Sequence, residues 1–118
     1  MTMTNKDKLL SYFKNFSNKD IDSLRKMFAE DVRLIDWEIA ESGIEDVVKA
    51  NQKIFDSVDS IIVKPMSIYH DGEDSFAAEI LIVINDKEFL EVVDIIEFDE
   101  DGLINSIKAY KKWKKSLT

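Results

Sequence analysis

Hydrophobic residues along this chain follow two different periods. Up to Phe55 they recur at spacings of three and four, which places them on one face of a helix. From Ser60 onward they alternate with polar residues, as in a strand with one buried face. The pattern predicts an α+β protein with helices in the first half and an antiparallel meander in the second.

Three helices are expected before Ser60. Thr4 is a suitable N-cap for the first helix, because Asp7 follows three positions later. A turn at residues 18–20 separates this helix from the second, with which it is expected to form an antiparallel hairpin. The third helix is expected to begin after Gly43. The apolar stripes of the three helices are Leu9, Tyr12, Phe13 and Phe16; Ile21, Leu24, Met27 and Phe28; and Ile44, Val47, Val48, Asn51, Ile54 and Phe55.

A short strand and a meander complete the expected fold. Residues 29–31 break the helical pattern, residues 32–36 alternate as a strand ending in an acid, and residues 38–42 resemble a loop. Pro65 has no N–H to donate, so its strand is expected at a sheet edge or at a bulge. The meander strands are expected at residues 60–70, 75–85 and 88–98, followed by 103–113, whose pattern fits a helix or a strand and for which we prefer the strand.

The strand EFLEVVDIIEF, residues 88–98, places an ionisable group on an apolar row. Read at the period of a strand, Asp94 shares its face with Leu90, Val92, Ile96 and Phe98. A buried carboxyl group has to find hydrogen-bond partners, stay protonated, or face a cavity that holds something else. The first outcome would make Asp94 a structural acid that fixes the strand register, and the others would make it a functional one.

Two other features of the pattern carry expectations. Tyr12 lies on the apolar stripe of the first helix, so we expect its hydroxyl to be hydrogen-bonded to a polar group inside the protein. The strand at residues 75–85 is apolar on both faces. Helices on one side of the sheet would leave the second apolar face exposed, which is typical of an interface. We therefore expect a homodimer through the outer face of the sheet.

Charge and composition narrow the classes of partner and chemistry. The chain has 16 basic and 24 acidic residues, a net charge of −8, which repels nucleic acid and anionic lipid. With no Cys, one His and dispersed acids, the sequence argues against a metal site and a cysteine nucleophile. A cluster of lysines lies near the C-terminus, and we interpret it as a solvated tail or, alternatively, as an anion site. Its members are Lys108, Lys111, Lys112, Lys114 and Lys115.

Length and terminal sequence bound the organisation of the chain. The 118 residues are enough for one domain with a hydrophobic core, expected to span residues 1–118. The N-terminal residues lack the apolar stretch of a signal peptide, and no apolar run approaches the roughly 18 residues of a membrane span. A cytoplasmic protein without a membrane partner is expected.

The order of these elements resembles that of a known family. The residues that carry the resemblance are LLSYFKNFSNKDIDSLRKMFAEDVRLID at 9–36, Gly43 before the third helix, and VVDIIEFDEDGLINSI at 92–107. They resemble the nuclear transport factor 2-like (NTF2-like) family, which includes the SnoaL-like polyketide cyclases and the ketosteroid isomerases. The resemblance implies a cone of three N-terminal helices packed on a curved antiparallel sheet, with a pocket that serves many ligands.

By the same resemblance, three polar residues match the catalytic positions of the ketosteroid isomerases. Asp36 would be the general base, and Tyr12 and a protonated Asp94 would donate hydrogen bonds to the developing oxyanion. The interval 36 − 12 = 24 agrees with the isomerase pattern. The sequence departs from the family at Trp37, where the isomerases usually have Pro, and two acids follow in the next loop, which implies a different pocket mouth.

The resemblance implies a cofactor-independent isomerase or cyclase that acts on a small apolar carbonyl compound. The side chains expected to bind the substrate are Trp37, Phe55, Leu34, Val92 and Ile96. The alternative is a non-catalytic ligand-binding or dimerisation module, in which Asp36 is a turn residue and Tyr12 a plain core aromatic. His70, before Asp71 and Gly72, is interpreted as an exposed turn residue rather than the catalytic His of dehydratase or cyclase relatives.

Overall fold

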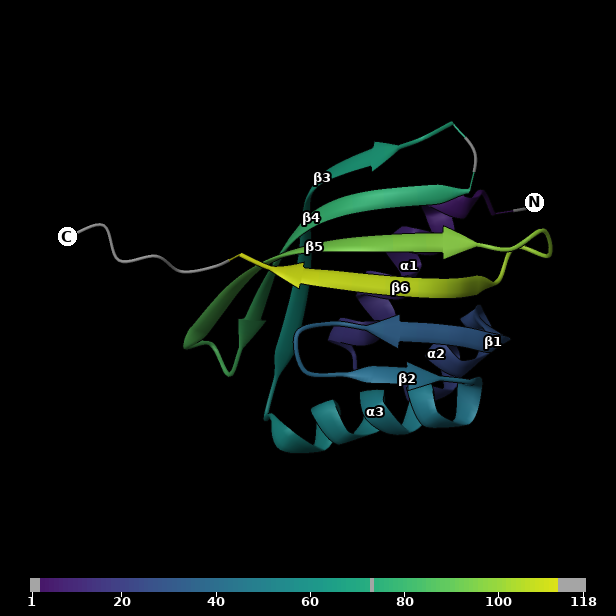
Figure 1. The fold of residues 1–118 in the computed structure, drawn as a ribbon. Coiled ribbons are helices and arrows are strands. Elements are labelled where there is room, and N and C mark those ends of the chain that lie inside the picture. Colours follow the sequence, from purple (N-terminus) through teal and green to yellow (C-terminus); the bar gives the residue numbers. More distant parts are fainter. Residues whose placement is uncertain (1–2, 73, 113–118) are drawn as a thin grey trace.

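The structure, a computed structural model, describes residues 3–72 and 74–112 (Figure 1). It has the expected α+β class. None of the helices in this part of the chain has the length and apolar character needed to cross a membrane. The elements are, in order, α1 (Asn5–Ser17), α2 (Ile21–Met27), β1 (Phe28–Ile35), β2 (Ala40–Ser42), α3 (Ile44–Ser57), β3 (Ile61–His70), β4 (Ser75–Ile84), β5 (Glu88–Phe98) and β6 (Ile104–Lys111).

The helices begin where the sequence predicted. The Thr4 hydroxyl accepts the Asp7 N–H at 3.1 Å, and the Asp7 carboxylate accepts the Thr4 N–H at 3.2 Å, which satisfies two N–H groups at the start of α1. Asp20 caps α2 by accepting the Ser23 N–H at 3.2 Å. Gly43 precedes α3 with a φ of +92°, a backbone conformation that residues other than glycine rarely adopt.

The six strands form one sheet in the order β2-β1-β6-β5-β4-β3. Strands β3 to β6 form the expected antiparallel meander, and the last segment is a strand over Ile104–Lys111, while Trp113 lies outside the described residues. Pro65 lies on the edge strand β3, where the pairing with β4 shifts register between Pro65 and Ser67. One pairing departs from the expected antiparallel sheet, since β1 runs parallel to β6.

The region around β1 differs from the sequence-based expectation. Strand β1 begins at Phe28, so residues 29–31 are part of the strand and do not separate it from the second helix. Its pairing with β6 shifts register between Phe28 and Arg33, and this bulge interrupts the alternation that marks a strand in the sequence. Residues 38–42, expected to be a loop, contain the three-residue strand β2.

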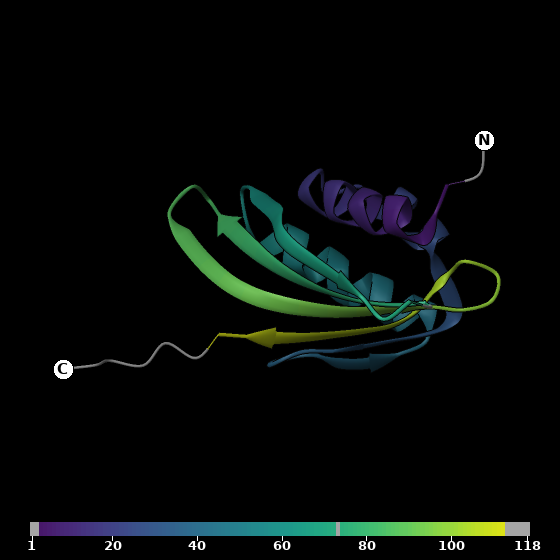
Figure 2. The same cartoon turned by 90° about the horizontal axis from the view of Figure 1, so that it is seen from above.

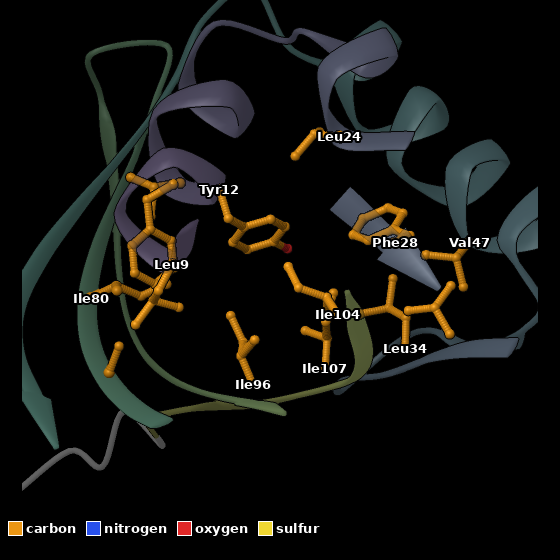
Figure 3. Close-up of a cluster of buried hydrophobic side chains, with 14 of the residues drawn as sticks. Leu9, Tyr12, Leu24, Phe28, Leu34, Val47, Ile80, Ile96, Ile104 and Ile107 are labelled. Atoms are coloured by element: carbon orange, nitrogen blue, oxygen red, sulfur yellow. The ribbon is translucent and has the colours of Figure 1, made fainter. Parts of the chain in front are cut away.

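The hydrophobic core lies between the helices and the sheet. Figure 2 shows the sheet curving around the side on which the three helices lie. The row on β5 that holds Asp94 faces this core, with Val92, Ile96 and Phe98 all buried. In Figure 3, Tyr12 projects from α1 into the middle of the cluster, between its own helix and the sheet.

The β4–β5 hairpin is tied to the chain that follows α3. Asn85, in the turn of the hairpin with a φ of +54°, accepts the N–H groups of Asp59 and Ser60 on Oδ1, at 2.7 and 3.0 Å. Its own N–H donates to the Ser60 carbonyl at 3.0 Å. Three hydrogen bonds therefore hold this end of the sheet against the α3–β3 connection.

Candidate active site

A cavity of about 350 Å³ lies between the helices and the curved sheet. It falls near the lower end of the range for ligand pockets, about 300–1,000 Å³. Its walls are mainly apolar, and come from α1, α3, β1 and strands β3 to β6. The exposed lining residues mark the mouth, where the β1–β2 connection, the end of α3 and the β4–β5 hairpin meet; they are Trp37, Glu38, Ser57, Glu88 and Lys111.

Asp94 lines this cavity from the middle of β5. Its cross-strand neighbours are Ala78 on β4 and Ala109 on β6, and these small side chains leave room beside the carboxyl group. Asp94 is 8% exposed. Its side chain makes no hydrogen bond to any residue in 3–72 or 74–112. The carboxyl group is thus offered to the contents of the cavity and not used to hold the strand.

Burial changes the acidity of this carboxyl group. It raises the pKa of Asp94 from 3.8 to about 7, and the nearby Asp36 carboxylate contributes to the increase. Near neutral pH both the protonated and the ionised forms are therefore populated. Of the outcomes open from the sequence, hydrogen bonding within the described residues is excluded, and Asp94 faces a cavity with a raised pKa.

Asp36 is the first residue after β1, and it also lines the cavity. Its Oδ1 accepts the N–H groups of Glu38 and Ile39 at 2.7 and 2.6 Å, and its own N–H donates to the Ile39 carbonyl at 2.8 Å. These bonds fix a tight turn, in keeping with its interpretation as a turn residue. Within the described part of the chain, Oδ2 makes no such bond, so one carboxylate oxygen is held and the other is available.

Tyr12 reaches the cavity from α1. Its ring packs against Phe13, Phe16 and Phe28, with centroid separations of 5.6, 6.1 and 6.3 Å. The expectation of a hydrogen-bonded hydroxyl was wrong for the residues that the structure describes, none of which bonds to it. Burial raises the pKa of Tyr12 above its ordinary value, and the carboxylates of Asp94 and Asp36 raise it further. Tyr12 therefore stays protonated and can donate.

Of the five side chains expected to bind a substrate, three line the cavity and two do not. Leu34, Trp37 and Val92 line the cavity, whereas Phe55 and Ile96 are buried in the core and do not. Phe55 lies behind Phe16, whose ring meets it edge-on at 4.8 Å. Ile96 lies two positions beyond Asp94, where the apolar row continues into the closed part of the core.

Trp37 forms part of the rim of the cavity. Its side chain lines the cavity and is 41% exposed, and the Lys111 ammonium lies 5.4 Å from the centre of its ring. This distance is in the range of a cation–π interaction. The charged groups of the lining are four carboxyl groups and one ammonium, on Asp36, Glu38, Glu88, Asp94 and Lys111. This balance disfavours an anionic ligand.

Asn51 is a lining residue that was predicted from the sequence only as part of the apolar stripe of its helix. It lies on the inner face of α3 and is 2% exposed. Its Nδ2 is the one inaccessible side-chain nitrogen or oxygen without a hydrogen-bond partner in residues 3–72 and 74–112. The signal was present in the sequence, because Asn51 is a polar residue on an apolar stripe, as Asp94 is on its row.

His70 lies apart from this site. It is exposed at the end of β3, as expected, and its ring stacks on Phe76 with a centroid separation of 4.1 Å. It does not line the cavity. No group of three or more acidic or histidine side chains in the described ranges is arranged to hold a metal ion.

Comparison with known proteins identifies the fold. The sequence matches no family profile and no curated protein. The structure is similar to an NTF2-like protein of unknown function from Cytophaga hutchinsonii, with a TM-score of 0.80, 12% identity, and coverage of 95% of this chain and 93% of the other. The chain has the NTF2-like fold.

Other solved structures with a similar fold differ in name. A "putative ketosteroid isomerase" from Kribbella flavida has a TM-score of 0.78 and 20% identity, covering 91% of this chain and 76% of the other. A "putative polyketide cyclase" from Sinorhizobium meliloti has a TM-score of 0.78 and 16% identity, covering 91% and 99%. At such identities the likeness concerns the NTF2-like fold, and the chemistry has to be argued from the cavity itself.

Proposed function

We propose that this NTF2-like protein is a SnoaL-like, cofactor-independent enzyme, an isomerase or cyclase that moves a proton next to a carbonyl group of a small apolar molecule. The observation that carries this proposal is the set of polar groups in the cavity. Tyr12, Asp36 and Asp94 all line it, and neither the Tyr12 hydroxyl nor the Asp94 carboxyl group bonds to a described residue. Unused polar groups in an apolar cavity are typical of sites that bind a polar reacting centre.

Asp36 is proposed as the general base. The backbone N–H groups of Glu38 and Ile39 hold Oδ1 and so fix the orientation of the carboxylate. Oδ2 would take a proton from the carbon beside the carbonyl group, and would later return it to another carbon of the same molecule. The proton is thus conserved, and the reaction requires no external acid, base or oxidant.

Tyr12 and Asp94 are proposed as the donors that stabilise the enolate. Negative charge develops on the carbonyl oxygen as the proton leaves, and hydrogen bonds to that oxygen become stronger in the transition state. The raised pKa of Tyr12 keeps its proton in place, and the raised pKa of Asp94, about 7, gives a protonated fraction near neutrality. Both groups lie in a mainly apolar wall, where such bonds are less screened by water.

The proposed substrate is compact and uncharged. A volume of about 350 Å³ has room for roughly a dozen water-sized groups at about 30 Å³ each. This suits a molecule of one or two rings better than a larger one. The excess of carboxyl groups in the lining favours a neutral ketone over a carboxylate or phosphate.

The test is isomerisation of β,γ-unsaturated cyclic ketones of one or two rings, followed by the ultraviolet absorbance of the conjugated product. We expect turnover by the unaltered protein and a loss of about 10²- to 10⁴-fold in kcat for Asp36→Asn. Asparagine keeps an oxygen for the two backbone N–H groups, so the turn should survive. Asp31→Asn, the same change at an exposed position of β1, is the matched control and should leave kcat unchanged.

Two results would contradict the proposal. Equal rates for the unaltered protein and Asp36→Asn would remove Asp36 from the mechanism. Binding of these ketones without turnover of any of them would favour the alternative, a non-catalytic ligand-binding module.

We also propose that the protein forms a homodimer through the outer face of the sheet. The partly buried apolar side chains Leu81, Val93 and Ile95 are on β4 and β5 but are not part of the core cluster. Phe89 on the same face is 62% exposed. A second copy of the same face would remove these side chains from water.

A further inference from the structure

The side chain of Asn51 has hydrogen-bonding groups that the described protein does not use. Its amide carries two donors and an acceptor. No hydrogen bond joins either amide atom to a residue in 3–72 or 74–112, and the side chain is 98% buried, being 2% exposed. Leaving such a group unpaired costs about 1–3 kcal/mol, so the position is unfavourable for stability alone.

Two other polar side chains of α3 show the contrast. The Gln52 amide, on the adjacent residue, donates to the Asp56 carboxylate at 2.8 Å on the outer side of the helix. The Ser57 hydroxyl donates to the Ile54 carbonyl at 2.7 Å. Both groups have partners within the helix, whereas Asn51 lines the cavity without one. The partner of Asn51 therefore has to be found among the contents of the cavity.

We propose that Asn51 is a specificity-determining residue that selects ligands carrying a second oxygen function in addition to the reacting carbonyl group. Tyr12 and Asp94 serve the carbonyl oxygen in the proposed function, on which this inference rests, and Asn51 serves a hydroxyl or carbonyl oxygen elsewhere on the molecule. A half-turn of the amide presents either its nitrogen or its oxygen. A ligand hydroxyl, which both donates and accepts, suits either orientation.

This assignment restricts the substrate class further. A plain hydrocarbon ketone would fill the apolar part of the cavity and leave the Asn51 amide without a partner. Sites that hydrogen-bond a ligand group discriminate strongly against analogues that lack it, because the buried polar group of the protein is then unpaired. The expected substrate is a small, neutral, cyclic hydroxyketone or diketone.

The test is binding of α-tetralone and of its derivatives with one hydroxyl group at different positions of the aromatic ring. Affinity is measured by quenching of tryptophan fluorescence, to which Trp37 at the mouth contributes. At least one hydroxylated ketone should bind the unaltered protein more tightly than α-tetralone by about threefold or more. Asn51→Leu, which keeps the size and removes the amide, should abolish that preference and leave the affinity for α-tetralone unchanged or higher.

The matched control is Gln52→Leu, the same change one position along the helix on an amide that faces away from the cavity. It should keep the preference for the hydroxylated ketone. Thermal unfolding of the unliganded proteins provides a second readout. Asn51→Leu should unfold at an unchanged or higher temperature, because an unpaired buried amide is replaced by hydrocarbon.

Three results would overturn the inference. The first is a hydroxyl preference that survives in Asn51→Leu. The second is a clear fall in the unfolding temperature of Asn51→Leu, which would give the amide a structural role. The third is a failure of all of these ketones to bind the unaltered protein. The binding experiment does not depend on turnover, so its result is separate from that of the kinetic test with Asp36→Asn. A protein can keep the hydroxyl preference and still fail to isomerise any ketone.

Discussion

Asp94 makes the stability of this protein depend on pH in an unusual direction for an acid. Its pKa is raised from 3.8 to about 7 by burial. Between these two pH values the folded protein holds a proton that the unfolded chain has released, so the contribution of Asp94 to stability falls as the pH rises through this window. Above pH 7 the folded protein contains an ionised, buried carboxylate without a partner in the described residues, and below pH 3.8 this cost is absent.

Replacing Asp94 by Asn should remove this dependence. At pH 8 the variant is expected to be more stable than the unaltered protein by up to about 4 kcal/mol, at about 1.4 kcal/mol per unit of pKa shift. The difference should shrink as the pH falls toward 4. Urea unfolding at a series of pH values measures it, with Asp31→Asn as an exposed control. A difference that is the same at every pH would show that Asp94 does not titrate in this way.

The sequence predicted the position of the polar residues better than their surroundings. A polar residue on an apolar row can be recognised from the sequence alone, and this applies to Asp94 and equally to Asn51. Whether a row faces a cavity or closed core depends on neighbouring elements, so Ile96 and Phe55 were assigned to a pocket that they do not line. The missing partner of the Tyr12 hydroxyl has the same origin, because long-range packing decides it.

At the scale of elements, local signals in the sequence predicted most boundaries. The capping residues Thr4 and Asp20 and the glycine at 43 mark the helix starts, and the two-residue period marks the meander. Strand β1 was less visible because its partner β6 is about seventy residues away in the sequence, and its bulge is set by that pairing. No pattern within residues 38–42 indicates that they pair with β1.

The turn of the β4–β5 hairpin is expected to contribute measurably to stability. Asn85→Gly tolerates the positive φ and removes only the two side-chain hydrogen bonds to Asp59 and Ser60. A loss of about 1–3 kcal/mol in the free energy of unfolding is expected. Asp86→Gly is the matched control, since Asp86 has a φ of +59° in the same turn and should change stability little. Equal effects of the two substitutions, measured by urea unfolding, would contradict this role of Asn85.

At the scale of the whole molecule, the two faces of the sheet differ in what packs against them. The inner face of the curved sheet holds the core and the cavity, whereas the outer face carries partly buried apolar side chains and has no helix of the described chain packed on it (Figure 2). The net charge of −8 opposes association, so an apolar contact of sufficient area has to outweigh it. Acidic side chains lie among the apolar ones on the same face, because Glu79 pairs with Val93 and Glu91 pairs with Leu81, and their charges add to this opposition.

A charge in the middle of the outer face should separate the proposed dimer. Val93 lies there between Glu79 on β4 and Tyr110 on β6. Val93→Lys is expected to convert the protein from a dimer to a monomer of 13.7 kDa in sedimentation or light-scattering measurements. Lys49→Glu, an exposed charge change on α3, is the control and should leave the dimer intact. A monomeric unaltered protein would rule out this assembly.

The tie made by Asn85 affects how a ligand gains admission. Because the hairpin and the α3–β3 connection are bonded to each other, that side of the entrance resists widening. The rim also carries the indole of Trp37, which is exposed and lies near the Lys111 ammonium. Widening of the entrance would therefore depend on movement of this indole, and the size of the side chain at position 37 is expected to affect the rates of ligand binding and release.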